Sequence, residues 1–212
     1  MKMKRLFFIV LVVVFSLHVS GQTKLTAEQQ KQLVEKIDKA ASAMKSMQCD
    51  FTQTKSMKLL KREMKSAGMM YFRQPDKLRW QYTSPYDYTF IMNGDKVRIK
   101  STKSTQDINV QGNKIFRQIT NIILNTVTGG GLKSASDFTV EVYKSDKGYF
   151  AKLYPKKKEV KQVYNVIEIY FNSSLTMVSS VRMIEKTGDE TLVNLNNLKA
   201  NASINEKMFA VD

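Results

Sequence analysis

Between Cys49 and Leu198 the chain consists largely of short runs in which apolar and polar residues alternate, and this pattern restricts the fold more than any other feature. A period of two places successive side chains on opposite faces of a β-strand. One face of the first run would carry Cys49, Phe51 and Gln53. The predicted strands continue at Gly68–Phe72, Lys77–Thr83, Tyr88–Met92, Lys96–Lys100, Asp107–Val110, Phe138–Tyr143, Tyr149–Tyr154, Val163–Phe171, Met177–Ile184 and Thr191–Leu198.

The connections between neighbouring runs are too short for parallel strands. Asn93-Gly94 is a strong signal for a tight hairpin, because both residues tolerate positive φ. A parallel crossover would need about a dozen residues, so strands joined this tightly must be antiparallel. No repeat, low-complexity tract or linker divides the chain. We therefore expect one mainly β domain of the α+β class, with about ten or eleven antiparallel strands and two or three helices.

A helix of about twenty residues is expected before the strands. Thr26-Ala27-Glu28-Gln29 has the composition of a capping box, with Thr26 as the N-cap and Gln29 reaching back to it. Apolar residues then recur every three or four positions, which predicts one apolar stripe packed on the core. The stripe consists of Leu33, Ile37, Ala41, Met44 and Met47.

A second helical segment interrupts the strands and ends at three consecutive glycines, residues 129–131. Glycines end a helix and leave a flexible joint. The segment is either a helix packed permanently on the sheet or a lid that swings over an apolar cavity. If it is a lid, serine at Ile119 or Ile122 would change the binding of an apolar ligand more than folding. Its apolar face carries Ile115, Phe116, Ile119, Ile122, Ile123 and Val127.

The N-terminus has the layout of a secretory signal peptide. Residues 1–5 are basic, residues 6–15 are an apolar run too short to span a bilayer comfortably, and Val19-Ser20-Gly21 supplies small residues for cleavage. We expect residues 1–21 to be removed and residues 22–212 to form the working domain. No cysteine at the cleavage site marks the product for lipid attachment, so we expect a soluble protein in the periplasm.

Removal of the signal would also remove His18, the single histidine. Histidine-based triads, proton shuttles and metal sites would then be excluded. Cys49 is the single cysteine, so it has no partner for an intramolecular disulfide, and its position beside Phe51 indicates a buried apolar thiol rather than a nucleophile.

The chain is strongly basic, with 34 Lys and Arg against 19 Asp and Glu and a formal net charge of +15. Export argues against nucleic acid as the target of this charge. Anionic membrane surfaces or acidic partner proteins fit better. The basic residues cluster around Lys55–Lys65 and in a predicted turn at Lys156–Lys161, where they would steer docking in a salt-dependent manner.

No motif for catalysis or for a cofactor is present. The sequence lacks a G-x-S-x-G elbow, a phosphate-binding Walker loop, H-E-x-x-H and C-x-x-C, and its carboxylates are scattered. It is instead rich in bulky apolar residues, with 11 Phe, 9 Tyr, 12 Met and one Trp. We expect no enzymatic activity, no cofactor and no metal, and a cavity for an apolar ligand.

The stretch from Asp50 to Gly94 reads Asp-Phe-Thr-Gln at residues 50–53, then Gly68 through Phe72 and Pro75 to Trp80, followed by Asn93-Gly94. In these residues and in their spacing from Gly68 to Trp80, the stretch resembles the outer-membrane lipoprotein carrier family, LolA. The terminal residues 204–212 and the helical segment near 115–127 also lie where the family has a closing element and a lid. The resemblance therefore spans nearly the whole of residues 22–212.

The resemblance implies an unclosed antiparallel half-barrel with helices over its concave face. Members of the family take lipid-modified proteins from an inner-membrane ABC-type releasing complex and pass them to an outer-membrane acceptor, while an apolar cavity shields the acyl chains. We expect a monomeric carrier of this kind. By position, Trp80 would line the cavity together with Phe51, Phe72, Phe90 and the apolar face of the lid.

One position departs from the family pattern. Members commonly have an arginine before the proline, where it helps to hold the lid closed, and this chain has Gln74. Either Arg73 or Arg79 supplies the latch instead, or Gln74 holds the lid with weaker, neutral hydrogen bonds. The glutamine favours a second hypothesis, a carrier of the same fold for a pigment, polyene or glycolipid precursor. A third hypothesis, which does not rest on Gln74, is a lipid-sensing regulator or an unrecognised enzyme.

Overall fold

The computed structural model describes residues 21–109, 128, 131–132 and 137–211. Its strands form one antiparallel sheet in the order β1-β8-β9-β10-β11-β12-β2-β3-β4-β5-β6-β7. The strands are β1 (Thr23–Lys24), β2 (Ser46–Met57), β3 (Arg62–Arg73), β4 (Lys77–Ser84), β5 (Tyr88–Asn93), β6 (Lys96–Ser101), β7 (Thr105–Asn109), β8 (Phe138–Ser145), β9 (Gly148–Pro155), β10 (Tyr164–Phe171), β11 (Val178–Glu185) and β12 (Glu190–Ala200).

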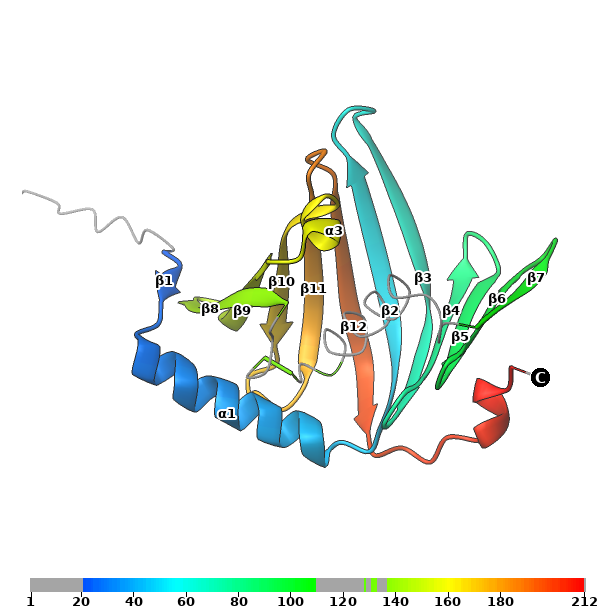
Figure 1. The fold of residues 1–212 in the computed structure, drawn as a ribbon, viewed down its shortest axis with the longest axis horizontal. Helices are drawn as coiled ribbons and strands as arrows, with labels where there is room; N and C mark the ends of the chain where they lie inside the picture. The colour runs from blue at the N-terminus through cyan, green and yellow to red at the C-terminus, as the bar shows by residue number, and fades with distance from the viewer. Residues whose placement is uncertain (1–20, 110–127, 129–130, 133–136, 212) are drawn as a thin grey trace, which may run out of the picture.

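The sheet is curved and open (Figure 1). Its two edge strands, β1 and β7, each pair on one side only, so the sheet is not closed into a barrel. The predicted fold class, a mainly β protein built on an unclosed antiparallel sheet, is confirmed. Each of the predicted runs overlaps a strand, and the strand order follows from hairpins between neighbours in the sequence plus two long-range pairings, β12 with β2 and β1 with β8.

Two strand details differ from the expectation. β1 was not predicted, because its two residues carry no periodic signal and become a strand only by pairing with Tyr143 and Lys144 of β8. The β5–β6 hairpin forms as predicted, but its turn is centred one residue later. Gly94 takes the positive φ of +61°, whereas Asn93 ends β5 and pairs with Lys96.

Helix α1 (Ala27–Ala43) begins as the sequence predicts and ends earlier. The Thr26 hydroxyl accepts from the Gln29 amide at 3.3 Å, and the Gln29 side chain accepts from the Thr26 amide at 3.0 Å, which completes the capping box. The expectation that Met47 belongs to the helix was wrong. Met47 lies in β2, opposite Phe72 of β3, because strand pairing on both sides replaces the last helical turn.

Two short helical elements complete the described fold. The basic turn predicted at Lys156–Lys161 contains α3 (Lys158–Lys161), one turn that buries Val160. After β12 the chain crosses the end of the sheet to a 3₁₀ helix, η1 (Glu206–Phe209), in which Phe209 is fully buried. Figure 1 shows α1 along one end of the sheet, with the C-terminus returning beside β4 and β5.

The predicted signal peptide and the predicted lid helix fall almost entirely outside the described residues, and both stay predictions. No helix in the described part of the chain is long and apolar enough to cross a membrane.

Candidate binding face

The pairing register lines up apolar side chains in rows across the sheet. Directly opposed residues in antiparallel strands project to the same face. We call the face that carries these rows the interior face, and the opposite one the outer face. The first row runs from β2 to β7 and consists of Met47, Phe72, Leu78, Met92, Val97 and Ile108.

A second row on the same face lies two residues further along the same strands. It consists of Cys49, Met70, Trp80, Phe90 and Ile99. On the other half of the sheet, a third row from β8 to β12 consists of Val142, Ala151, Ile169, Val181 and Val193. The interior face is therefore apolar nearly from one edge of the sheet to the other.

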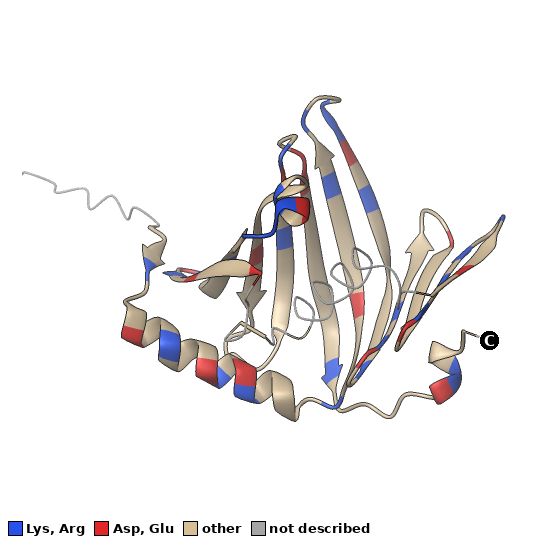
Figure 2. Cartoon of the chain, in the orientation of Figure 1, with Lys and Arg blue, Asp and Glu red and all other residues tan. Residues whose placement is uncertain are grey.

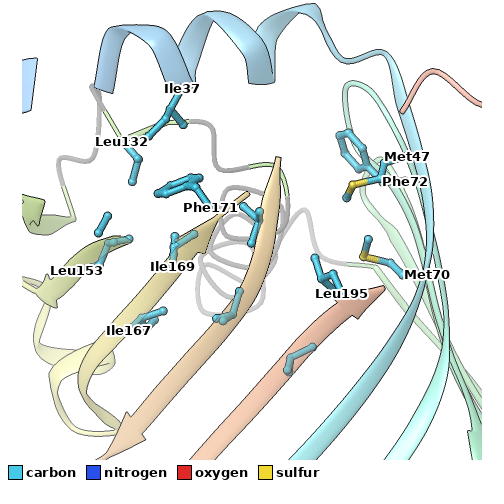
Figure 3. Close-up of a cluster of buried hydrophobic side chains, with 14 of the residues drawn as sticks. Ile37, Met47, Met70, Phe72, Leu132, Leu153, Ile167, Ile169, Phe171 and Leu195 are labelled. Atoms are coloured by element: carbon cyan, nitrogen blue, oxygen red, sulfur yellow. The ribbon is translucent and has the colours of Figure 1, made fainter. Parts of the chain in front are cut away.

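Both halves of the sheet contribute to one cluster of buried side chains (Figure 3). In the close-up, Ile169 and Phe171 lie on one side and Met70 and Phe72 on the other, and the two groups face the same interior region. Helix α1 adds Ile37 to this cluster from one end of the sheet. The curvature of the sheet thus turns the rows into a single concave apolar surface.

An aromatic group occupies the middle of the interior face. The Phe51 ring lies 4.5 Å from the Trp80 ring and 5.1 Å from the Tyr82 ring, centroid to centroid, with the Tyr82 contact edge to face. The Tyr82 hydroxyl donates to Gln53 at 3.0 Å. Gly68 lies between Phe51 and Tyr82 in the register, and a Cβ there would come within 2.8 Å of the Phe51 ring. Glycine at this position makes room for the rings.

Trp80 also brings a polar group to this apolar surface. Its indole Nε1 is buried and has the Tyr82 hydroxyl as a polar neighbour, but it makes no hydrogen bond of normal length and angle with the described residues. A buried N–H without an acceptor is unfavourable by about 1–3 kcal/mol, so an oxygen atom supplied by a ligand would be stabilised there.

The structure brings four of the predicted cavity residues together on the interior face. Phe51 and Phe72 are fully buried, and Trp80 and Phe90 are partly buried and directly opposite each other. The remaining predicted members, Ile115, Phe116, Ile119, Ile122 and Ile123, lie outside the described residues, so their role stays a prediction.

Both arginines proposed as lid latches lie on the outer face, where they bind the C-terminal segment. Arg73 contacts the Glu206 carboxylate and the Ile204 carbonyl, and its guanidinium lies 5.9 Å from the centre of the Phe209 ring. Arg79 donates to the Met208 carbonyl at 3.3 Å. These contacts fasten η1 to β3 and β4.

Gln74 instead reaches a helix. It lies in the turn between β3 and β4, and its Nε2 donates to the Ala41 carbonyl in the last turn of α1 at 3.1 Å. The Gln74 amide donates to the Lys45 carbonyl at 2.9 Å. The Ala41 carbonyl also accepts from the Met44 amide at 3.3 Å, so Gln74 adds a second donor to it and stabilises the end of α1 where the helix meets the sheet. Whether any of the three residues also holds residues 115–127 stays a prediction.

Cys49 is a buried thiol on the interior face, as the sequence predicted. Burial, with a smaller contribution from the Asp50 carboxylate, raises the pKa of the thiol to about 12. A nucleophilic cysteine needs the opposite shift. Within the described residues, no group of three or more His, Cys, Asp or Glu side chains could hold a metal ion.

Sequence reasoning missed a polar network on the outer face. The buried Glu168 carboxylate accepts from Tyr170 at 2.8 Å and contacts Arg182 at 3.4 Å and Lys152 at 3.5 Å. Burial and the bond to Glu168 raise the pKa of the Tyr170 hydroxyl to about 12. The alternation of polar residues in β9–β11 is the available signal, but it does not reveal which charges meet. The network lies on the outer face of β9, β10 and β11 and leaves the interior face of these strands apolar.

An open antiparallel sheet with a continuous apolar interior face defines a class of binding proteins whose site is a surface of packed side chains rather than a set of reactive groups. Residues 42–212 match the family described as outer membrane lipoprotein carrier protein LolA. The chain belongs to this family.

Individual relatives support the assignment at low identity. The chain is 25% identical over 166 residues to an outer-membrane lipoprotein carrier protein of Methylococcus capsulatus, covering 78% of this chain and 76% of the relative. It is 26% identical over 203 residues to the protein of the same name from Legionella pneumophila strain Lens, covering 95% and 92%. An uncharacterized conserved protein from Thermus thermophilus shares the fold, with a TM-score of 0.52, 10% identity and coverage of 85% and 92%.

Proposed function

We propose that this protein is a soluble periplasmic carrier that binds the acyl chains of lipid-modified proteins on its interior face and moves them to the outer membrane. The observation that carries the proposal is the set of apolar rows that crosses the open sheet from β8 to β7. Family membership and the names of the relatives support the choice of lipoproteins as cargo.

The energetics explain why such a surface is needed. An acyl chain of ~15 methylenes gains about 12 kcal/mol when it is removed from water, at ~0.8 kcal/mol per methylene. A lipoprotein free in the periplasm would therefore aggregate or return to a membrane. A carrier has to recover much of this free energy and still release the chain, and partly buried residues such as Phe90 and Ile99 provide apolar area that a ligand can cover.

The buried Trp80 Nε1 adds a polar feature that suits this cargo. Acyl chains are attached through ester or amide carbonyls, and a carbonyl oxygen beside Trp80 would satisfy the buried donor. In this proposal an inner-membrane ABC-type complex supplies the lipoprotein and an outer-membrane acceptor receives it. The carrier itself performs no covalent step.

Native mass spectrometry of the protein purified from its own periplasm tests the cargo. The proposal predicts a co-purifying protein whose mass includes covalently attached acyl chains. A small lipid or pigment in its place would favour the alternative carrier with the same fold. A protein that repeatedly purifies without any apolar ligand and does not take up a lipopeptide would contradict both.

A further inference from the structure

The turn between β2 and β3 carries two exposed leucines that the fold does not explain. Leu59 is 91% exposed and Leu60 is 64% exposed. They are the central residues of a turn in which the Lys61 amide approaches the Lys58 carbonyl at 3.4 Å and Lys61 takes a φ of +47°. Turns of this kind are normally built from Gly, Asn, Asp, Pro or Ser. Two leucines at the apex therefore call for a contact outside the chain.

This turn, which we call the hairpin tip (residues 58–62), projects from the sheet. Ser84, the last residue of β4, pairs with Ala67, so residues 62–66 of β3 extend beyond β4. At ~3.4 Å per residue the overhang is roughly 15 Å. The tip is braced on its other side, where the Lys58 amide donates to the Asp189 carboxylate at 3.1 Å. Figure 1 shows it at the end of the sheet opposite α1.

Cations surround the leucines. Residues 58–65 contain four cations, Lys58, Lys61, Arg62 and Lys65, and one acidic residue, Glu63. All of these side chains are exposed. Two neighbouring segments lie at the same end of the sheet. The α3 region, Lys156–Lys161, adds four lysines and one acidic residue, Glu159, whereas the β11–β12 turn carries both Lys186 and Asp189 (Figure 2). We call this end of the sheet the cationic rim.

The exposed apolar residues gather on the same rim. Because successive antiparallel strands reverse direction, the ends of β2, β4 and β9 lie at one end of the sheet, as do the starts of β3, β5 and β10. Each large apolar side chain recorded as exposed in the described part of the chain is found there: Leu59, Leu60, Met64, Tyr86, Tyr88, Tyr154 and Val163. The part of this rim around Leu59, Leu60 and Met64, where exposed apolar residues and cations are neighbours in the sequence, is typical of a surface that lies on an anionic bilayer.

We propose that the hairpin tip and the cationic rim bind the surface of an anionic phospholipid membrane, with Leu59 and Leu60 entering the boundary between headgroups and acyl chains. Lys58, Lys61, Arg62 and Lys65 bind the phosphate groups around them. An acidic protein would be attracted by the same cations, but it gives no reason for leucines at the apex of a projecting turn. This membrane binding is separate from the carrier function and does not depend on bound cargo.

Co-sedimentation of the cargo-free protein with vesicles tests the proposal. The protein is expected to bind vesicles of phosphatidylglycerol and phosphatidylcholine in equal parts, to bind pure phosphatidylcholine much less, and to dissociate as salt is raised. Leu59→Ser combined with Leu60→Ser should weaken binding by at least about tenfold without changing thermal stability, because both side chains are exposed.

Charge variants supply the matched control. Lys61→Gln with Lys65→Gln should also weaken vesicle binding, whereas Lys31→Gln with Lys36→Gln removes the same charge from exposed positions on α1 and should leave it nearly unchanged. If the two double variants weakened vesicle binding equally, binding would not be specific to the cationic rim.

A probe at the tip reports insertion directly. Leu59→Cys can be labelled selectively with a polarity-sensitive fluorophore, because Cys49 is buried. Its emission should shift to the blue on addition of anionic vesicles, whereas a label on Lys31→Cys should not respond. The proposal would be overturned if the leucine variants bound vesicles like the parent and the label at position 59 showed no blue shift. If the same variants slowed only transfer to an acceptor protein, the tip would be a protein-docking site instead.

Discussion

At the scale of single residues, Gly68 decides how the centre of the interior face is packed. A Cβ at this position would lie 1.9 Å from the Gln81 carbonyl oxygen on the neighbouring strand, in addition to its clash with the Phe51 ring. The obstacle is backbone, which cannot move aside like the end of a flexible side chain. The glycine is therefore required by the close approach of β3 and β4 and not by its own φ angle.

Gly68→Ala is accordingly expected to destabilise the protein by about 2 kcal/mol or more, because β3 and β4 would have to separate. Urea denaturation followed by circular dichroism measures the change. Ala67→Ser adds one atom at the next position of the same strand and should cost far less. A Gly68→Ala protein as stable as the parent would show that the two strands are not held this closely.

The buried thiol of Cys49 makes the stability of the protein depend on pH. Its folded pKa of about 12 lies above the unfolded value, so the unfolded state loses the proton first. The thiol's contribution to stability is present below about pH 8.5 and is lost as the pH rises from there toward the folded pKa, by at most about 1.4 kcal/mol per pH unit. Stability should therefore fall more steeply above about pH 9 in the parent than in Cys49→Ala.

Urea denaturation of both proteins across this range measures the difference. In the native protein the thiol should also resist a thiol reagent until the chain unfolds. Rapid labelling under native conditions, or identical pH profiles of the two proteins, would be inconsistent with a buried, protonated Cys49.

At the scale of elements, the sequence predicts what local residues determine and misses what distant partners determine. The alternation in β2–β12 and the capping box at Thr26 and Gln29 are local, and the structure shows them as predicted. Met47 continues the helical stripe in the sequence, yet Phe72 and Ala200 pair with it and make it part of a strand.

The candidate site follows the same rule. Phe51, Phe72, Trp80 and Phe90 could be placed on one face because strand alternation is regular. The partners of Arg73 and Arg79 could not be predicted, because Glu206 and Met208 are more than a hundred residues away along the chain.

The junction between α1 and the β3–β4 turn gives a test at this scale. Gln74→Ala removes the hydrogen bond to the Ala41 carbonyl and should cost about 1 kcal/mol. It should also speed amide hydrogen exchange in the last turn of α1. Gln74→Arg retains a donor and should preserve the junction. If both variants behave like the parent, the contact does not hold the helix end.

At the scale of the whole molecule, the two ends of the sheet differ. One end is covered by α1 and fastened by the C-terminal segment, and the other is the cationic rim with its exposed leucines. The interior face runs between them. In the proposed account, one molecule thus combines a surface for acyl chains with a separate surface for the membranes that those chains leave and enter.

Site-specific photo-crosslinking tests the central claim that acyl chains occupy the interior face. A photoreactive phenylalanine analogue is placed at Phe90 on the interior face, or at Tyr71, which lies partly buried on the outer face of the adjacent part of the sheet. After loading with a triacylated lipoprotein and illumination, mass spectrometry locates the adduct. The account predicts an adduct between position 90 and an acyl chain, and none from position 71. Equal labelling from both positions, or adducts only to the polypeptide of the lipoprotein, would contradict it.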